Sequence, residues 1–142
     1  MQEWALWALA SAVFAALTAI FAKVGLEGID SNFATFIRTL VIATALVLFL
    51  TYAKKWQPLG ELSARNWLFL TLSGLATGAS WLAYFKALQM GSASQVAPLE
   101  KLSVVLVVVF AVIFLGERPS AREWIGIALI ASGVFTLVFA DK

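Results

Sequence analysis

The chain has 142 residues, of which 62% are hydrophobic and 13% charged, and its formal net charge is +2. Soluble domains have about half apolar and about a quarter charged residues, so this composition excludes an ordinary soluble domain. The small net charge gives no support for nucleic-acid binding, and a sequence without Cys or His lacks disulfides, thiol nucleophiles and the commonest catalytic base and metal ligand.

Five apolar runs are long enough to cross a bilayer as helices. A spanning helix needs about 20 largely apolar residues, because the hydrocarbon core is about 30 Å thick and a helix rises about 1.5 Å per residue. Strands of a barrel would be about 10 residues long and alternating, so helices are favoured. We predict an all-α membrane protein, a five-transmembrane-helix bundle, as one domain over residues 1–142. Its helices cover about residues 4–22, 32–51, 67–87, 92–115 and 124–140.

The second run carries a charge well inside it. Asp30, Ser31 or Asn32 can serve as the N-cap of this helix. Arg38 lies about six residues further on, roughly 9 Å below the surface at the helical rise. A charge at this depth either faces a cavity or a partner, or its long stem carries the guanidinium back to the interface.

The third run contains Gly74 and Gly78 at GxxxG spacing. This spacing lets two helix backbones approach closely, either between neighbouring spans of one chain or between two chains. Trp81 and Tyr84 follow on one helical face, in the membrane half that also contains Arg38. They either line a cavity for an organic solute or belong to an interfacial aromatic belt.

The fourth run has two possible starts. It begins near Ser92 with a kink at Pro98, or it begins at Pro98, which suits a first helical position. With the earlier start, Glu100 lies roughly 12 Å deep and could pair with Arg38 at a similar depth. With the later start, Glu100 only complements the dipole of the first turn. Adjacent residues point about 100° apart on a helix, so we expect Glu100 and Lys101 to point in different directions.

The fifth run has Gly126 and Gly133 on one face, seven residues apart, as candidate packing positions. Lys and Arg in the joints then give a weak orientation signal. Five of these residues lie on the N-terminal side and three on the other. The positive-inside rule places the N-terminus in the cytoplasm. A bias this weak is also what a chain with dual topology, inserting both ways round, would show.

Three stretches resemble an EamA domain of the drug/metabolite transporter superfamily. The most specific is Gly91-Ser-Ala-Ser-Gln-Val-Ala-Pro-Leu-Glu-Lys-Leu-Ser-Val-Val105 with its Leu115-Gly116-Glu117 exit, and residues 73–87 and 124–133 agree. Typical members have two such domains of opposite orientation, ten helices in all. This chain is similar to the five-helix bacterial and archaeal members, so the resemblance implies one half of the ten-helix fold.

The resemblance also implies transport of small organic metabolites and a longer fourth helix in which Pro98 is a kink. The candidate cavity residues that it implies, with Lys101 added because it adjoins one of them, are Arg38, Trp81, Tyr84, Ser94, Gln95, Glu100 and Lys101. A transporter of inverted repeats needs two inverted units around a midplane site. We therefore predict a homodimer, with the antiparallel arrangement favoured over the parallel one.

The predicted function is a secondary transporter of small organic or amphipathic solutes in the cytoplasmic (inner) membrane of a prokaryote, working by alternating access. Its expected partners are the solute, the lipid bilayer and a second copy, without nucleic acid. The sequence has no nucleophile-and-base set, phosphate loop or metal cluster, so we expect no enzyme activity, cofactor or metal. The alternative function is a non-transporting membrane scaffold or accessory subunit.

Overall fold

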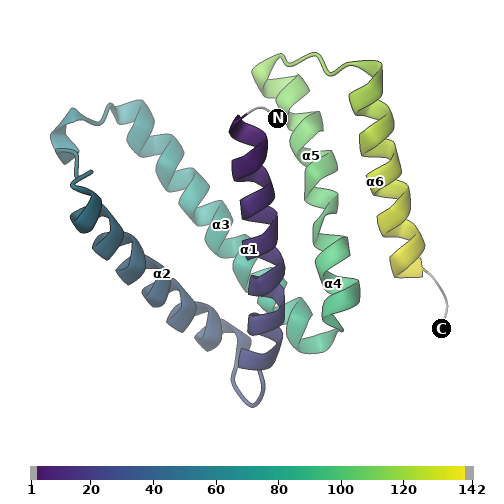
Figure 1. Cartoon of the computed structure of the whole chain (residues 1–142), viewed down its shortest axis with the longest axis horizontal. Helices are drawn as coiled ribbons and strands as arrows, with labels where there is room; N and C mark the ends of the chain where they lie inside the picture. Colours follow the sequence, from purple (N-terminus) through teal and green to yellow (C-terminus); the bar gives the residue numbers. More distant parts are fainter. Residues whose placement is uncertain (1–2, 140–142) are drawn as a thin grey trace. The chain divides into compact units, whose positions relative to one another are not determined.

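The computed structural model describes residues 3–139, and all regular structure in this range is helical (Figure 1). Its elements are α1 (Glu3–Gly25), α2 (Ser31–Ala53), the short 3₁₀ turn η1 (Leu59–Glu61), α3 (Ala64–Met90), α4 (Ala93–Glu100), α5 (Leu102–Phe110), the π-helical turn η2 (Ala111–Leu115) and α6 (Ala121–Phe139). The predicted end of the last helix at residue 140, and Lys142, lie outside the described residues.

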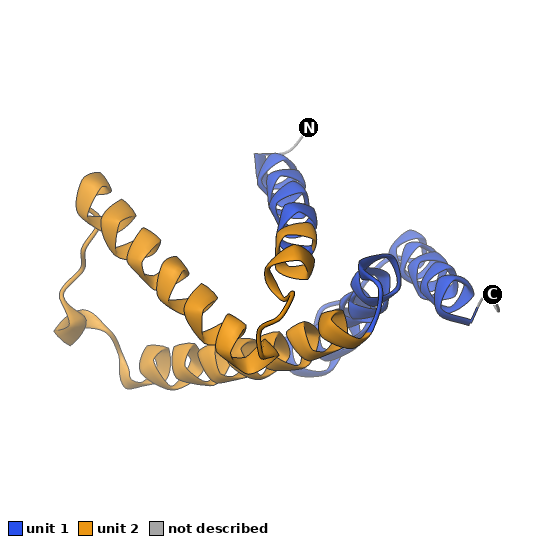
Figure 2. Ribbon diagram, turned by 90° about the horizontal axis from the view of Figure 1, so that it is seen from below, with its two compact units in different colours: residues 1–19, 91–142 blue, residues 20–90 orange. Residues whose placement is uncertain are grey.

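Five helices are long and apolar enough to cross a membrane, because α4, α5 and η2 run on as one span, Ala93–Leu115. The prediction of an all-α protein with five membrane-spanning-length helices is confirmed. The helices divide between two compact units (Figure 2). Unit 2 is Ile20–Met90, in which α2 packs on α3. The described residues on either side of it form unit 1, in which α4, α5 and α6 pack on one another.

Side-chain caps explain where several helices begin. The Asp30 carboxylate accepts hydrogen bonds from the backbone N–H groups of Asn32 (2.9 Å) and Phe33 (3.1 Å), so Asp30 is the N-cap of α2. Before α6, the Glu123 carboxylate accepts from the Ser120 N–H (2.6 Å) and hydroxyl (2.8 Å). These bonds form much of a capping box, which satisfies donors that the first helical turn leaves open.

The fourth span has the earlier of its two possible starts. Ser92 is the N-cap of α4, and Pro98 lies inside the helix. Pro98 has no N–H to donate to the Ser94 carbonyl, and its ring crowds that turn. The helix is interrupted three residues later at Lys101, whose N–H bonds to the Pro98 carbonyl at 3.0 Å in a tighter turn. The span is therefore two helical segments joined at one residue.

Apolar side chains point away from the protein along each span. In α5, for example, Leu106 is 54% and Val107 62% exposed. Several hydroxyl groups on the spans bond to their own helix: Thr44 donates to the Leu40 carbonyl at 2.9 Å and Thr136 to the Ser132 carbonyl at 2.8 Å. Both features suit a hydrocarbon surrounding, in which apolar surface is solvated and polar groups must be satisfied internally.

At two positions the backbone conformation favours glycine. Gly28, between α1 and α2, has φ of 72°, and Gly116, which ends η2, has φ of 69°. Both values lie in the left-handed region that glycine adopts without a steric cost. The predicted packing glycines are in a different situation. Beyond the backbone of its own helix, a β-carbon built at any of them would meet no atom within 4 Å, and packing through them stays a prediction: Gly74, Gly78, Gly126 and Gly133.

Candidate functional site

Unit 2 has a polar stripe on α2. Ser31 and Thr35 are buried and Arg38 is half-buried, and their spacing of four and then three residues places them on one helical face. On α3 the residues at the matching spacing are Trp81, Phe85 and Leu88. The two helices are antiparallel, and a hydrogen bond from Gln89 Nε2 to the Ile29 carbonyl (2.9 Å) joins the end of α3 to the residues before α2. Arg38 therefore lies at the depth of the two aromatic rings.

The Arg38 guanidinium lies over two ring faces of α3. Its central carbon is 4.5 Å from the centroid of the Trp81 ring and 5.0 Å from that of the Phe85 ring. Trp81 and Phe85 are four residues apart and share one helical face, so both rings reach the same cation. Arg38 follows Ser31 by seven residues, about 10 Å along the helix. The structure thus brings together Arg38 and Trp81, two of the residues predicted to line a cavity.

The rings offset some of the cost of placing this charge in a bilayer, but they accept no hydrogen bond from it. An arginine at the centre of a spanning helix costs about 2.5 to 3.5 kcal/mol on the insertion scale. Cation–π contacts contribute about 2 kcal/mol when they are desolvated. Within unit 2, the contacts of the Arg38 guanidinium are with ring faces, and no hydrogen bond or ion pair to it is present there. Its N–H donors are therefore without an acceptor in unit 2.

Tyr84 adjoins this cluster. Its ring meets that of Phe85 edge to face, with the centroids 6.3 Å apart and the planes at 76°. This geometry is favoured by the ring quadrupoles and fixes the Phe85 ring beneath Arg38. Tyr84 thus supports the cluster through Phe85.

Glu100 and Lys101 lie in unit 1, where their side chains form an ion pair at 2.7 Å. The expectation that these neighbours point in different directions is wrong. The helix is interrupted at Lys101, and its long flexible stem bends back to the carboxylate of the preceding residue. The pair neutralises two charges within one span.

Ser94 and Gln95 lie at the start of α4 and are engaged locally. The Ser92 hydroxyl donates to Gln95 Oε1 at 2.8 Å and lies 3.3 Å from the Ser94 hydroxyl. These residues and Glu100 belong to unit 1, whereas Arg38 and Trp81 belong to unit 2. Their convergence on one cavity, and a pair between Arg38 and Glu100, stay predictions.

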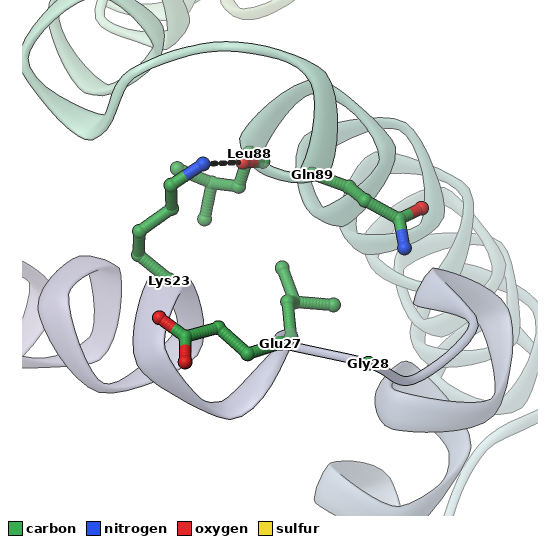
Figure 3. A pocket seen from close by; sticks show the side chains of 6 residues that line it. Lys23, Glu27, Gly28, Leu88 and Gln89 are labelled. Atoms are coloured by element: carbon green, nitrogen blue, oxygen red, sulfur yellow. Dashed lines mark hydrogen bonds between the residues drawn. The ribbon is translucent and has the colours of Figure 1, made fainter.

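A pocket of about 360 Å³ lies at the end of unit 2, between the last turn of α1 and the last turn of α3 (Figure 3). The Lys23 ammonium donates to the Leu88 carbonyl at 2.6 Å, and Gln89 and Glu27 lie on the rim. A lysine on a carbonyl near a helix C-terminus satisfies an acceptor there and complements the helix dipole. The hydrogen bond at this pocket therefore joins the end of α1 to the end of α3. Among residues 3–139, no group of three His, Cys, Asp or Glu side chains gathers as a metal site would need.

The sequence analysis did not predict two of these side-chain contacts. Phe85 was not predicted beside Arg38, although its spacing of four from Trp81 places it on the same face. The bond from Lys23 to Leu88 joins residues 65 positions apart, and no local pattern indicates it.

Comparison with known proteins agrees with the fold. A sequence profile of the EamA-like transporter family matches residues 2–139. A protein of Sinorhizobium sp named "uncharacterized transporter in cobO 3'region" is 56% identical over 136 residues, which are 96% of each chain. The "uncharacterized transporter YxxF" of Bacillus subtilis is 27% identical over 135 residues, 94% of this chain but 42% of that protein. No solved structure matches. The chain is a multi-pass membrane protein that belongs to the EamA-like transporter family.

Proposed function

We propose that the protein is a secondary transporter that moves small organic metabolites or amphipathic compounds across the cytoplasmic membrane by alternating access. The observation that carries this proposal is the Arg38 guanidinium inside a span, over the Trp81 and Phe85 rings. An intramembrane charge is costly and usually marks a solute or ion pathway. A scaffold that only packs against a partner has no use for it.

The working unit in this proposal is a homodimer of inverted copies. The Bacillus relative is more than twice as long as the segment that this chain matches, and the Sinorhizobium relative is matched over 96% of its length. A second unit of similar length thus fits within the longer relative. Two copies of a shorter chain would supply the same content, and opposite insertion would supply the inverted repeat. The N-terminus is cytoplasmic in one copy and external in the other.

Flux into liposomes tests the transport proposal. Purified protein is reconstituted, and uptake of labelled amino acids, organic acids and organic amines is compared with uptake by protein-free liposomes. We expect at least one class to move faster with protein and to slow at least tenfold in Arg38→Gln. Arg65→Gln is the matched control, because Arg65 lies over the Phe69 ring at 5.8 Å at the exposed start of α3.

The alternative of a scaffold or accessory subunit predicts a different result. No solute would move faster than in protein-free liposomes, and Arg38→Gln would behave as wild type.

A further inference from the structure

The charges within unit 2 do not balance. Its acidic residues are Glu27, Asp30 and Glu61, and all three lie in the joints between α1, α2 and α3. The Asp30 carboxylate is already engaged by two backbone N–H groups as a helix cap. The Arg38 guanidinium therefore lies within its span with no carboxylate of unit 2 at its depth.

In unit 1, by contrast, the two charges inside the fourth span balance each other. Glu100 is paired with Lys101 at 2.7 Å, so the acid of that span already has its own cation. Arginine keeps its proton at any pH that proteins experience, so it does not become neutral by releasing a proton. The Arg38 charge is therefore met by no carboxylate within unit 2.

The contacts of Arg38 leave its hydrogen-bonding capacity unused. The Trp81 and Phe85 rings attract the cation through their faces, at 4.5 and 5.0 Å from their centroids. Ring faces provide no oxygen acceptor. The fork of N–H donors matches the two oxygens of a carboxylate, and such bidentate pairs are among the strongest hydrogen bonds in proteins. The rings also form an apolar surface beside this fork.

From this arrangement we infer that the Arg38, Trp81 and Phe85 cluster binds the anionic group of the solute, and that the substrate class is a small organic acid with an apolar part. The inference rests on the proposed transport function and names its substrate class. The carboxylate meets the donor fork of Arg38, and the apolar part lies against the rings. An organic amine is disfavoured, because its charge would face Arg38 without a carboxylate between them.

Binding to protein in phosphatidylcholine nanodiscs tests the inference without requiring flux. The probes are labelled benzoate, phenylacetate and octanoate, each with its neutral amide and its corresponding amine, so that size is matched and charge varies. We expect at least one acid to bind at least tenfold more tightly than its amide, and the amines to bind most weakly. Equal binding of acid and amide in all three series, or tightest binding of the amines, would overturn the inference.

Variants locate the preference. Arg38→Gln should remove the preference for acid over amide, and Trp81→Leu should weaken both, whereas Arg65→Gln should bind as wild type does. Circular dichroism and size-exclusion chromatography check that each variant is folded. If Arg38→Gln does not fold, the acid, amide and amine order of the wild-type protein decides. A preference for acids that survives in folded Arg38→Gln contradicts the assignment to this cluster.

Two further experiments distinguish a lipid headgroup from a solute as the bound anion, and the anion site from the transport function. In nanodiscs that contain phosphatidylglycerol, acid binding should persist; if the anionic lipid abolishes it in an Arg38-dependent way, the site holds a lipid headgroup and the solute proposal is wrong. Acid binding without flux would contradict transport and leave the anion site intact. Flux of amines that is unchanged in Arg38→Gln would support transport and overturn the anion site.

Discussion

Arg38 and Glu100, the two charged residues predicted to lie deep in the spans, are stabilised by different contacts. Arg38 is held by ring faces four residues apart on the neighbouring helix, and Glu100 is held by the residue that follows it in the chain. The first arrangement leaves the N–H donors of Arg38 without an acceptor in unit 2, whereas the second leaves almost no net charge on the Glu100 and Lys101 pair. This difference makes Arg38 the stronger candidate for contact with solute, and gives Glu100 and Lys101 a role in allowing their span to enter the bilayer.

A double-mutant cycle on Glu100 and Lys101 tests that role. Glu100→Gln leaves the Lys101 ammonium alone in the span, and we expect it to destabilise the protein by about 1 to 3 kcal/mol, since an unpaired charge in lipid is costly. Lys101→Met alone should do the same for the carboxylate. The double variant should recover most of the loss in thermal unfolding.

Glu117→Gln, in the exposed joint before α6, is the control and should change stability little. Single variants that are as stable as the wild-type protein would show that the ion pair does not matter to the span.

At the scale of single residues, helical spacing in the sequence predicts which side chains lie at a similar depth in the membrane. Arg38 and Trp81 were expected in the same membrane half because both depths can be counted from helix ends. The Glu100 and Lys101 pair was missed because it depends on an interruption one residue wide. The bond from Lys23 to the Leu88 carbonyl was missed because it requires the path of the chain between them.

The fourth span is the element whose structure departs most from a regular helix. It is interrupted at Lys101, after Pro98, and it ends in the π-helical turn η2. Both features leave backbone groups with weaker or altered hydrogen bonds, and π turns are frequent at functional sites. Within the proposed cycle of alternating access, this span is the one best suited to bend.

Replacing Pro98 with Ala tests that idea. The new N–H can bond to the Ser94 carbonyl, so α4 and α5 should join into a straighter helix. We expect the melting temperature to rise and solute flux in liposomes to fall at least threefold. Pro119→Ala, in the joint after η2, is the matched control and should leave flux unchanged. Normal flux in a Pro98→Ala protein of higher stability would contradict a role for bending.

The five spans were predictable because bilayer thickness limits their length. The bounds of α6 show what was harder: the helix begins at Ala121, since the Ser120 and Glu123 cap adds a turn before the apolar run from Trp124. The turn η2 lies in an apolar stretch without a Gly or Pro before Gly116, so no local residue type signals the change in hydrogen bonding.

The whole molecule carries far more exposed apolar side chains than a soluble protein would. Examples are Trp7 at 78% and Phe114 at 76% exposure. Lipid covers such surface, and in the proposed homodimer a second copy of the chain covers part of it. The longer Bacillus relative, of which the matched segment is 42%, has room for a second unit of similar length, as the proposed pair of copies requires.

The proposal of two inverted copies is tested most directly by labelling single cysteines from one side of the membrane. The sequence contains no Cys, so Glu27→Cys in the joint before α2 and Glu61→Cys in η1, which follows α2, each introduce the only thiol, on opposite membrane faces. A membrane-impermeant maleimide is applied to sealed spheroplasts and then to lysed ones. We predict that each variant is labelled in part before lysis and further after it. Labelling of one variant only before lysis, and of the other only after it, would contradict the inverted pair.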